Sequence, residues 1–174
     1  RSFYTDMACG PKYFTYINQE LPTLCRRFFG IQPVPERTYI MGLSMGGYGA
    51  MKCAFTAPQQ YAGCAGFSSV AEIQAELPQL CRWHEDQAIF PHGIVPPQDD
   101  LFDLVEKFRD GTCPMPRLFL ACGQQDSLYP ANLRLRDTLQ AMNCPLTWYE
   151  APGDHNWFFW NDALGRAMKE LLEN

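Results

Sequence analysis

Short apolar runs alternate along the chain with longer segments whose apolar residues recur every three or four positions. A run of four to six consecutive apolar residues is typical of a buried strand, and apolar residues that recur every three or four positions are typical of an amphipathic helix. Strands are predicted at residues 38–41, 62–67, 118–122 and 146–150, and helices at 13–29, from Gly47 to Ala57, between Asp99 and Gly111, at 131–142, and at the C-terminal end from Trp160 to Leu171. Strands joined by helices predict an α/β domain with a mostly parallel sheet flanked by helices.

Prolines and capping residues along the chain refine this prediction. Pro22 lacks a backbone donor and predicts a kink or restart within helix 13–29. Asp99 is predicted to cap the helix that carries Leu101 and Leu104. Residues 70–98 contain four prolines and no sustained period, which indicates an irregular, lid-like insertion. With no composition break, residues 1–174 are predicted to form a single domain.

The net charge of the chain is −5, with 14 Lys and Arg against 19 Asp and Glu. A protein that binds nucleic acid needs a surplus of cations, so no nucleic-acid partner is expected. No apolar stretch approaches the roughly 20 residues of a membrane span, so no membrane association is expected either. The sequence carries no signal for an oligomeric state.

Eight cysteines occur, and no two of them are spaced as Cys-x-x-Cys. Most lie in apolar runs, as Cys64 and Cys122 do, which favours small buried thiols in a reducing, cytoplasmic compartment. The chain starts at Arg1 without a signal peptide, so an exported form remains the alternative.

The segment Gly42-Leu43-Ser44-Met45-Gly46 fits the pattern Gly-x-Ser-x-Gly between a predicted strand and a predicted helix. The chemistry needs this spacing because the turn that exposes the serine is sharp, and glycine two residues before and after relieves the crowding. The helix that follows directs the backbone N–H of Met45 toward an oxyanion. The alternative is a glycine-rich turn with an incidental serine.

An activated serine needs a base, and the base needs an acid that orients it. His155 follows the last predicted strand, where catalytic groups of a parallel sheet collect, whereas His84 and His92 lie in the insertion and are expected to face solvent. Asp126 follows the third strand and is the predicted acid. Asp154 is its rival, although a residue adjacent to the histidine usually points away from the ring.

The order Ser44, Asp126, His155 is that of the α/β-hydrolases. The segment 42–50, Gly123-x-x-Asp126 and Gly153-x-His155-x-Trp157-x-x-Trp160 resemble the nucleophile, acid and histidine segments of the esterase D family, which includes tributyrin, feruloyl and acetyl esterases, S-formylglutathione hydrolases and, more distantly, mycolyltransferases. Residues 2–7 resemble the loop that enters the site in tributyrin-esterase-like members. The resemblance implies an α/β-hydrolase fold and a serine carboxylesterase that forms an acyl-enzyme on a small ester substrate, with no metal and no organic cofactor. Tyr4 and Trp157 are the substrate-binding candidates.

The chain also departs from the family pattern. Only 43 residues precede Ser44, and they contain no His-Gly turn to supply a second oxyanion donor. The chain is therefore expected to be the C-terminal two-thirds of such an enzyme, with strand 38–41 as an unpaired apolar edge.

Three interpretations remain open at this point. The first is a serine esterase for small tributyrin-, acetyl- or feruloyl-type esters. The second keeps the same triad in an acyltransferase or an S-formylglutathione-type thioesterase. The third is a catalytically incomplete piece that needs another segment.

Overall fold

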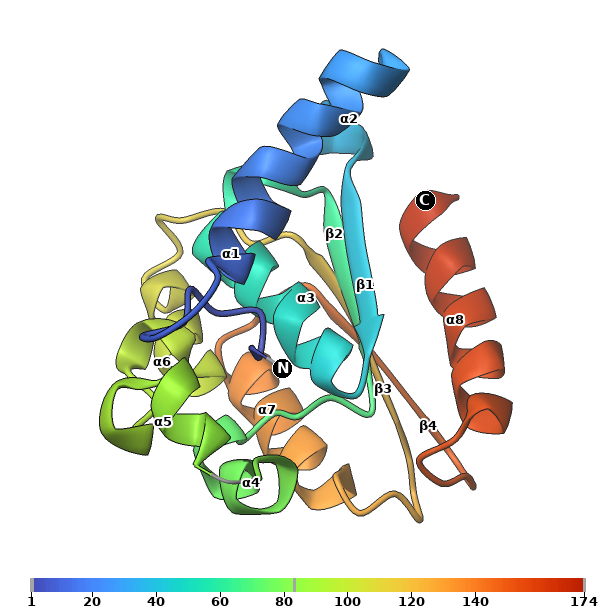
Figure 1. Ribbon diagram of the computed structural model, residues 1–174. Coiled ribbons are helices and arrows are strands. Elements are labelled where there is room, and N and C mark those ends of the chain that lie inside the picture. Colours follow the sequence, from blue (N-terminus) through green and yellow to red (C-terminus); the bar gives the residue numbers. More distant parts are fainter. Residues whose placement is uncertain (1, 83, 174) are drawn as a thin grey trace.

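Four parallel strands form one sheet in the order β1-β2-β3-β4 (Figure 1). This computed structural model describes residues 2–82 and 84–173, and the statements below concern those residues. The strands are β1 (Tyr39–Leu43), β2 (Gly63–Phe67), β3 (Arg117–Gly123) and β4 (Leu146–Ala151). All four predicted strands and their parallel arrangement are confirmed.

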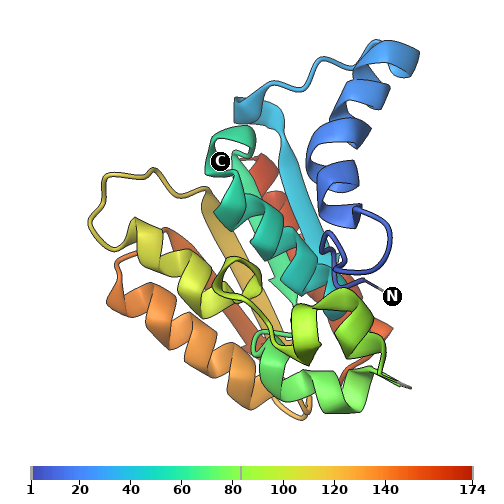
Figure 2. The same cartoon turned by 60° about the vertical axis from the view of Figure 1, so that its left-hand side comes forward.

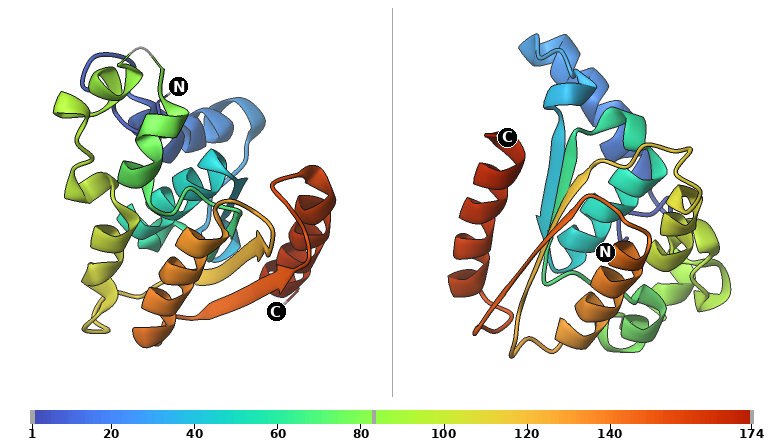
Figure 3. Two further views of the ribbon diagram at one scale, coloured as in Figure 1. Left: turned by 90° about the horizontal axis from the view of Figure 1, so that it is seen from below. Right: turned by 180° about the vertical axis from the view of Figure 1, so that it is seen from behind.

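Helices cover both faces of the sheet. They are α1 (Tyr13–Thr15), α2 (Leu21–Phe29), α3 (Met45–Thr56), α4 (Ile73–Leu80), α5 (Glu85–Ile89), α6 (Leu101–Val105), α7 (Tyr129–Ala141) and α8 (Trp157–Leu172). Helix α8 lies alone on one face, and α3, α6 and α7 lie on the other, as the view from behind shows (Figure 3). The result is the predicted α/β architecture of three layers.

The two faces of the sheet are filled by alternate residues of each strand. In β3, Leu118 and Leu120 pack toward α3 and α7, whereas Phe119 and Ala121 pack toward α8. This alternation follows from the two-residue period of a strand. Because both faces are covered, β2 and most of β3 are fully buried.

Strands β1 and β4 are the exceptions, because both are half-buried along their whole length, although the sequence predicts a buried strand at β1. They lie at the two ends of the strand order, and among the described strands β1 hydrogen-bonds only to β2 and β4 only to β3. An apolar run indicates a strand. How deeply the strand is buried depends on the strands and helices beside it, and the run itself carries no information about them.

The segment at residues 13–29 forms a helical arm that extends beyond the end of the sheet (Figures 1 and 2). It passes from α1 through a wide π turn at Tyr16–Glu20 into α2, and the backbone remains helical at both junctions. The irregularity predicted near Pro22 is therefore a π turn that precedes it and not a restart of the helix. Gly30 ends the arm in the left-handed conformation, at φ 67°.

Residues 70–98 contain short helices, as predicted, but much of the segment is firmly packed. Ile73, Leu77, Ile89 and Phe90 are all buried in the main core. The segment therefore contributes buried side chains to the hydrophobic core of the domain.

The predicted helix cap at Asp99 is wrong by one residue. The side chain of Asp100 accepts the backbone N–H groups of Phe102 and Asp103 and caps α6. Asp99 is buried instead and forms an ion pair with Lys52 of α3. Adjacent aspartates are equivalent in sequence pattern, and only the tertiary partner of Asp99 separates them.

The spacing of Trp160, Met168 and Leu171 along the sequence predicts an apolar face for the last helix. In α8, however, Met168 is 46% exposed, while Phe159 and Ala163 are buried. Of the cysteines, Cys53, Cys64 and Cys122 are buried, as small thiols in apolar runs are expected to be, whereas Cys9 is exposed. Within the described residues, no helix combines the length and the apolar character that crossing a membrane requires.

Candidate active site

Ser44 lies on the sharp turn between β1 and α3. Its backbone has φ 55° and ψ −123°, a conformation that residues other than glycine rarely adopt. Two backbone hydrogen bonds hold this turn, one to the last residue of β2 and one to the segment that follows β2. The N–H of Ser44 donates to the carbonyl of Phe67 over 2.8 Å, and the N–H of Val70 donates to the carbonyl of Ser44 over 3.2 Å. The strained turn is thus fixed by its neighbouring strand.

The glycines around Ser44 have different reasons to be glycine. A Cβ at Gly42 would overlap the carbonyl oxygen of Gly46, so the predicted crowding is real at this position. A Cβ at Gly46 would come no closer than 3.5 Å to the Tyr4 hydroxyl, an ordinary contact distance, so the predicted crowding is wrong at this position. At Gly47 a Cβ would overlap the hydroxyl of Ser69. The crowding that demands glycine therefore falls on positions 42 and 47.

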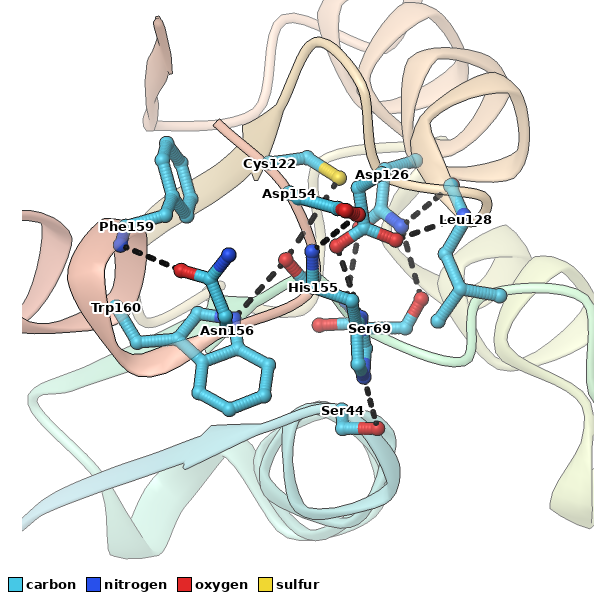
Figure 4. A network of polar contacts seen from close by, with 12 residues as sticks. Ser44, Ser69, Cys122, Asp126, Leu128, Asp154, His155, Asn156, Phe159 and Trp160 are labelled. Carbon is cyan, nitrogen blue, oxygen red and sulfur yellow. Dashed lines mark hydrogen bonds and ion pairs between the residues drawn. The ribbon is translucent and has the colours of Figure 1, made fainter. Parts of the chain in front are cut away.

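His155, Asp126 and Ser44 lie in one hydrogen-bonded row (Figure 4). The Nε2 atom of His155 is 2.9 Å from Oγ of Ser44, and its Nδ1 atom is 2.8 Å from Oδ2 of Asp126. A carboxylate only accepts, so Nδ1 carries the proton and Nε2 is free to accept from the serine. Asp154 bonds the backbone N–H of His155 instead of the ring.

The electrostatics of the row suit a base at the histidine. The hydrogen bond that His155 donates to Asp126, together with the negative charge of Asp126, raises the pKa of His155 against the lowering effect of burial, and the charge of Asp154 adds to the rise. Burial alone would raise the pKa of Asp126, but the hydrogen bonds from His155, Ser68 and the Leu128 N–H hold it below its ordinary value. Asp126 is therefore ionised at neutral pH.

The other predicted groups fall in different places. His84 and His92 are exposed, as expected. In the described part of the chain, no three His, Cys, Asp or Glu side chains are grouped so as to hold a metal ion. Met45 opens α3, and the backbone N–H groups of a first helical turn have no partner within the helix, so its N–H is available to an oxyanion.

Two cavities meet at Ser44 and Met45. One has a volume of about 540 Å³, lies along β1 and α3, and is lined by Tyr4 and Ile17 as well. The other has a volume of about 260 Å³ and is bordered by Phe3 and by the end of α4. A nucleophile between two hollows can place an acyl group in one and a leaving group in the other.

Tyr4 and Trp157, the two predicted substrate-binding residues, are placed differently. The ring of Tyr4 lies where a side chain at Gly49 would be, and its hydroxyl reaches toward Gly46 in the first turn of α3. Trp157 is 59% exposed and packs edge-on against Trp160, with ring centroids 5.5 Å apart. It lines neither of the two cavities at Ser44.

A second layer of polar side chains behind the row was not singled out from sequence. Asn132 of α7 is buried; its Nδ2 donates to the carbonyls of Ser69 and Leu128, and its Oδ1 accepts from the N–H of Ser69. Ser68 and Ser69 are also fully buried, and the Ser69 hydroxyl has no partner among the described residues. The available signal was position: polar residues that directly follow a buried parallel strand lie at the edge where sites form.

Comparison with known proteins connects this geometry to a family. Residues 3–102, more than half of the chain, match the family model described as "Putative esterase". The chain belongs to this esterase family of α/β-hydrolases. A curated relative is an acetyl esterase of Caldicellulosiruptor saccharolyticus, which is 29% identical over 178 residues, covering 97% of this chain and 67% of that protein.

Solved structures show the same fold over nearly the whole of this chain. FphF, a fluorophosphonate-binding serine hydrolase of Staphylococcus aureus, is 31% identical with a TM-score of 0.86, covering 99% of this chain and 68% of that one. An S-formylglutathione hydrolase of the same organism, FrmB, is 32% identical with a TM-score of 0.83, covering 98% and 67%. The predicted α/β-hydrolase fold and family are confirmed, and the chain spans about two thirds of the length of these relatives.

Proposed function

We propose that this esterase is a serine carboxylesterase that hydrolyses small acyl esters through an acyl-enzyme on Ser44. The observation that carries the proposal is the row in which Ser44 Oγ, His155 and Asp126 are joined by contacts of 2.9 and 2.8 Å on a strained turn. Such a row supplies a nucleophile, a general base and the acid that orients the base.

In the first half-reaction, Nε2 of His155 takes the proton of Ser44 as Oγ attacks the ester carbonyl carbon. The N–H of Met45 donates to the oxyanion that forms. The intermediate collapses, and the protonated His155 gives its proton to the departing alcohol. The acyl group remains on Ser44 Oγ.

In the second half-reaction, water takes the place of the alcohol. His155 accepts a proton from the water as its oxygen attacks the acyl carbon, and a second tetrahedral intermediate releases the acid and free Ser44. The ionised Asp126 stabilises the imidazolium in both steps. We also propose that residues 70–98 act as a lid, since Gln79, Leu80 and Arg82 border the smaller cavity at Ser44.

Fluorophosphonate labelling tests the proposal, with the modified residue located by mass spectrometry and Ser44→Ala as the control. Labelling at Ser44 is expected, together with hydrolysis of p-nitrophenyl acetate that the Ser44→Ala variant lacks. Labelling that persists in Ser44→Ala would refute the assignment. A folded chain that is not labelled would support the incomplete-piece interpretation.

A second candidate on the same row is thioester hydrolysis, favoured by the name of the S-formylglutathione hydrolase relative. The two candidates share the acyl-enzyme and differ in the leaving group. Competing a thioester against an oxygen ester of the same acyl group compares their kcat/KM values directly. Adding a competing alcohol and measuring the transferred ester identifies an acyltransferase.

A further inference from the structure

Trp160 of α8 contacts His155, a member of the row, and Ser68, which lies beside the acid. Its ring lies edge-on to the ring of His155, with centroids 4.9 Å apart and an interplanar angle of 86° (Figure 4). Its indole N–H donates to Oγ of Ser68 over 3.1 Å. A buried indole usually finds some acceptor, but here that acceptor is itself bonded to the acid.

Ser68 is fully buried and directly follows β2. Its hydroxyl hydrogen-bonds to the side chain of Asp126. The carboxylate only accepts, so Ser68 donates its single proton to Asp126 and uses a lone pair for Trp160. The thiol of Cys122, 3.9 Å away, donates weakly to the same oxygen. The Ser68 hydroxyl therefore links the indole N–H of Trp160 to the carboxylate of Asp126.

The backbone at Ser68 supports a functional reason for this side chain. Its φ is 46°, in the left-handed region that a glycine adopts without a steric clash. A serine is strained there, and relative to glycine it contributes only the hydroxymethyl group. Strain that the surrounding structure sustains at a buried residue is typical of functional sites.

Three donors fix the carboxylate of Asp126 from different sides. His155 Nδ1 lies 2.8 Å from Oδ2, the N–H of Leu128 donates to Oδ1 over 2.9 Å, and Ser68 supplies the third bond. A carboxylate held in this way cannot rotate out of the plane in which it orients the imidazole. The edge-on contact with the ring of Trp160 also restrains the imidazole.

We propose that Ser68 and Trp160 are positioning residues that extend the Ser44–His155–Asp126 row by two hydrogen bonds and keep Asp126 aligned with His155. The proposal rests on the proposed function of the row. It adds a requirement for the Ser68 hydroxyl and the Trp160 indole N–H, acting as one unit.

The test measures kcat and KM for p-nitrophenyl acetate in Ser68→Gly, Ser68→Ala, Trp160→Phe and the double variant Ser68→Gly/Trp160→Phe. Ser68→Gly removes the hydroxyl and the backbone strain together, so its melting temperature is expected to stay at or above that of the parent chain. Trp160→Phe keeps an aromatic ring at this position and removes the indole N–H together with part of the bicyclic ring, a loss of volume that the control variant below shares. Ser68→Ala retains the strain and serves as the second hydroxyl-free variant.

The matched control is Trp148→Phe. Trp148 of β4 also donates its indole N–H to an acidic side chain, Glu150, over 2.7 Å, and that pair lies outside the row. The control therefore separates the effect of losing any indole hydrogen bond from the effect of losing the bond between Trp160 and Ser68. The control is expected to keep kcat within twofold.

Ser68→Gly and Trp160→Phe are each expected to lower kcat about 10-fold, the size of weakening one charge-assisted hydrogen bond, with KM changed less than twofold. The double variant is expected to fall no further than the worse single one, because both changes break one unit. Single variants within twofold of the parent, or a double variant equal to the product of the two losses, would overturn the inference. Persistent labelling of Ser44→Ala would instead overturn the proposed function.

Discussion

The Nδ1 atom of His155 lies 2.8 Å from Oδ2 of Asp126, although 29 positions separate the two residues in the chain. Their loops follow the paired strands β3 and β4 and touch at two glycines, since a Cβ on Gly123 would overlap the carbonyl of Gly153. The N–H of Gln125 donates to that carbonyl over 2.9 Å, and its side chain accepts the N–H of Gly153 over 2.6 Å. Adjacent strands therefore present acid and base as one preassembled pair.

The pH dependence of catalysis follows from the raised pKa of His155. The base must be neutral to accept the serine proton, so kcat/KM rises with pH as His155 loses its proton. Because Asp126 and Asp154 raise that pKa, the midpoint is expected above pH 6.5, the ordinary value for histidine. A profile of kcat/KM against pH measures it, and a midpoint below 6.5 would contradict the assignment.

Asp154→Asn tests the cause of this shift without removing the acid. Asparagine keeps an oxygen for the backbone N–H of His155 but removes the negative charge that favours the imidazolium. The midpoint of the profile is expected to move to lower pH, by less in high salt because Asp154 is exposed. Asp103→Asn, on α6, is the control and should leave the midpoint where it was.

Gly49→Ala is expected to displace Tyr4. A Cβ at this position would overlap the ring of Tyr4, so the substitution is expected to cost about 1–3 kcal/mol and to lower kcat/KM by altering the larger cavity. Urea unfolding and ester kinetics measure the two effects. An unchanged stability would mean that Tyr4 does not pack on α3 in solution.

Gly165→Ala in α8 is the matched glycine substitution. The position is exposed, and a Cβ there would meet no atom within 4 Å. Alanine is expected to stabilise the helix by about 0.5–1 kcal/mol, because glycine loses more conformational freedom on folding. A loss of stability in urea unfolding would count against the helical assignment.

Lys52→Met is expected to destabilise the protein strongly. The ammonium of Lys52 pairs with buried Asp99 and donates to Oγ of Thr5 over 2.7 Å, so its removal leaves a carboxylate buried without its cation. A loss of about 3–5 kcal/mol is expected from urea unfolding. Arg109→Gln breaks the exposed Arg109–Glu106 pair and is expected to cost less than about 1 kcal/mol.

The elements that sequence predicted are those set by local pattern. Strand and helix periods, the glycine at position 42 and the polar residues after strands are written in short windows, and they gave the sheet and the order of Ser44, Asp126 and His155. The contacts of Ser68 and Trp160 were not predictable in this way, because 92 positions separate them. Likewise, only a distant lysine distinguishes Asp99 from Asp100.

The position of β1 has a consequence for how the active site is lost on heating. Ser44 follows β1 and His155 follows β4, and each of these strands has one hydrogen-bonded neighbour in the described sheet. The segments that carry the acid and the base are also hydrogen-bonded to each other, through Gln125 and Gly153. Loosening of the β1–β2 ladder would carry the serine away from an imidazole that remains in place. On heating, enzymatic activity is then lost at a lower temperature than the bulk of the helical structure, and inactivation reports on one edge of the sheet rather than on the molecule as a whole.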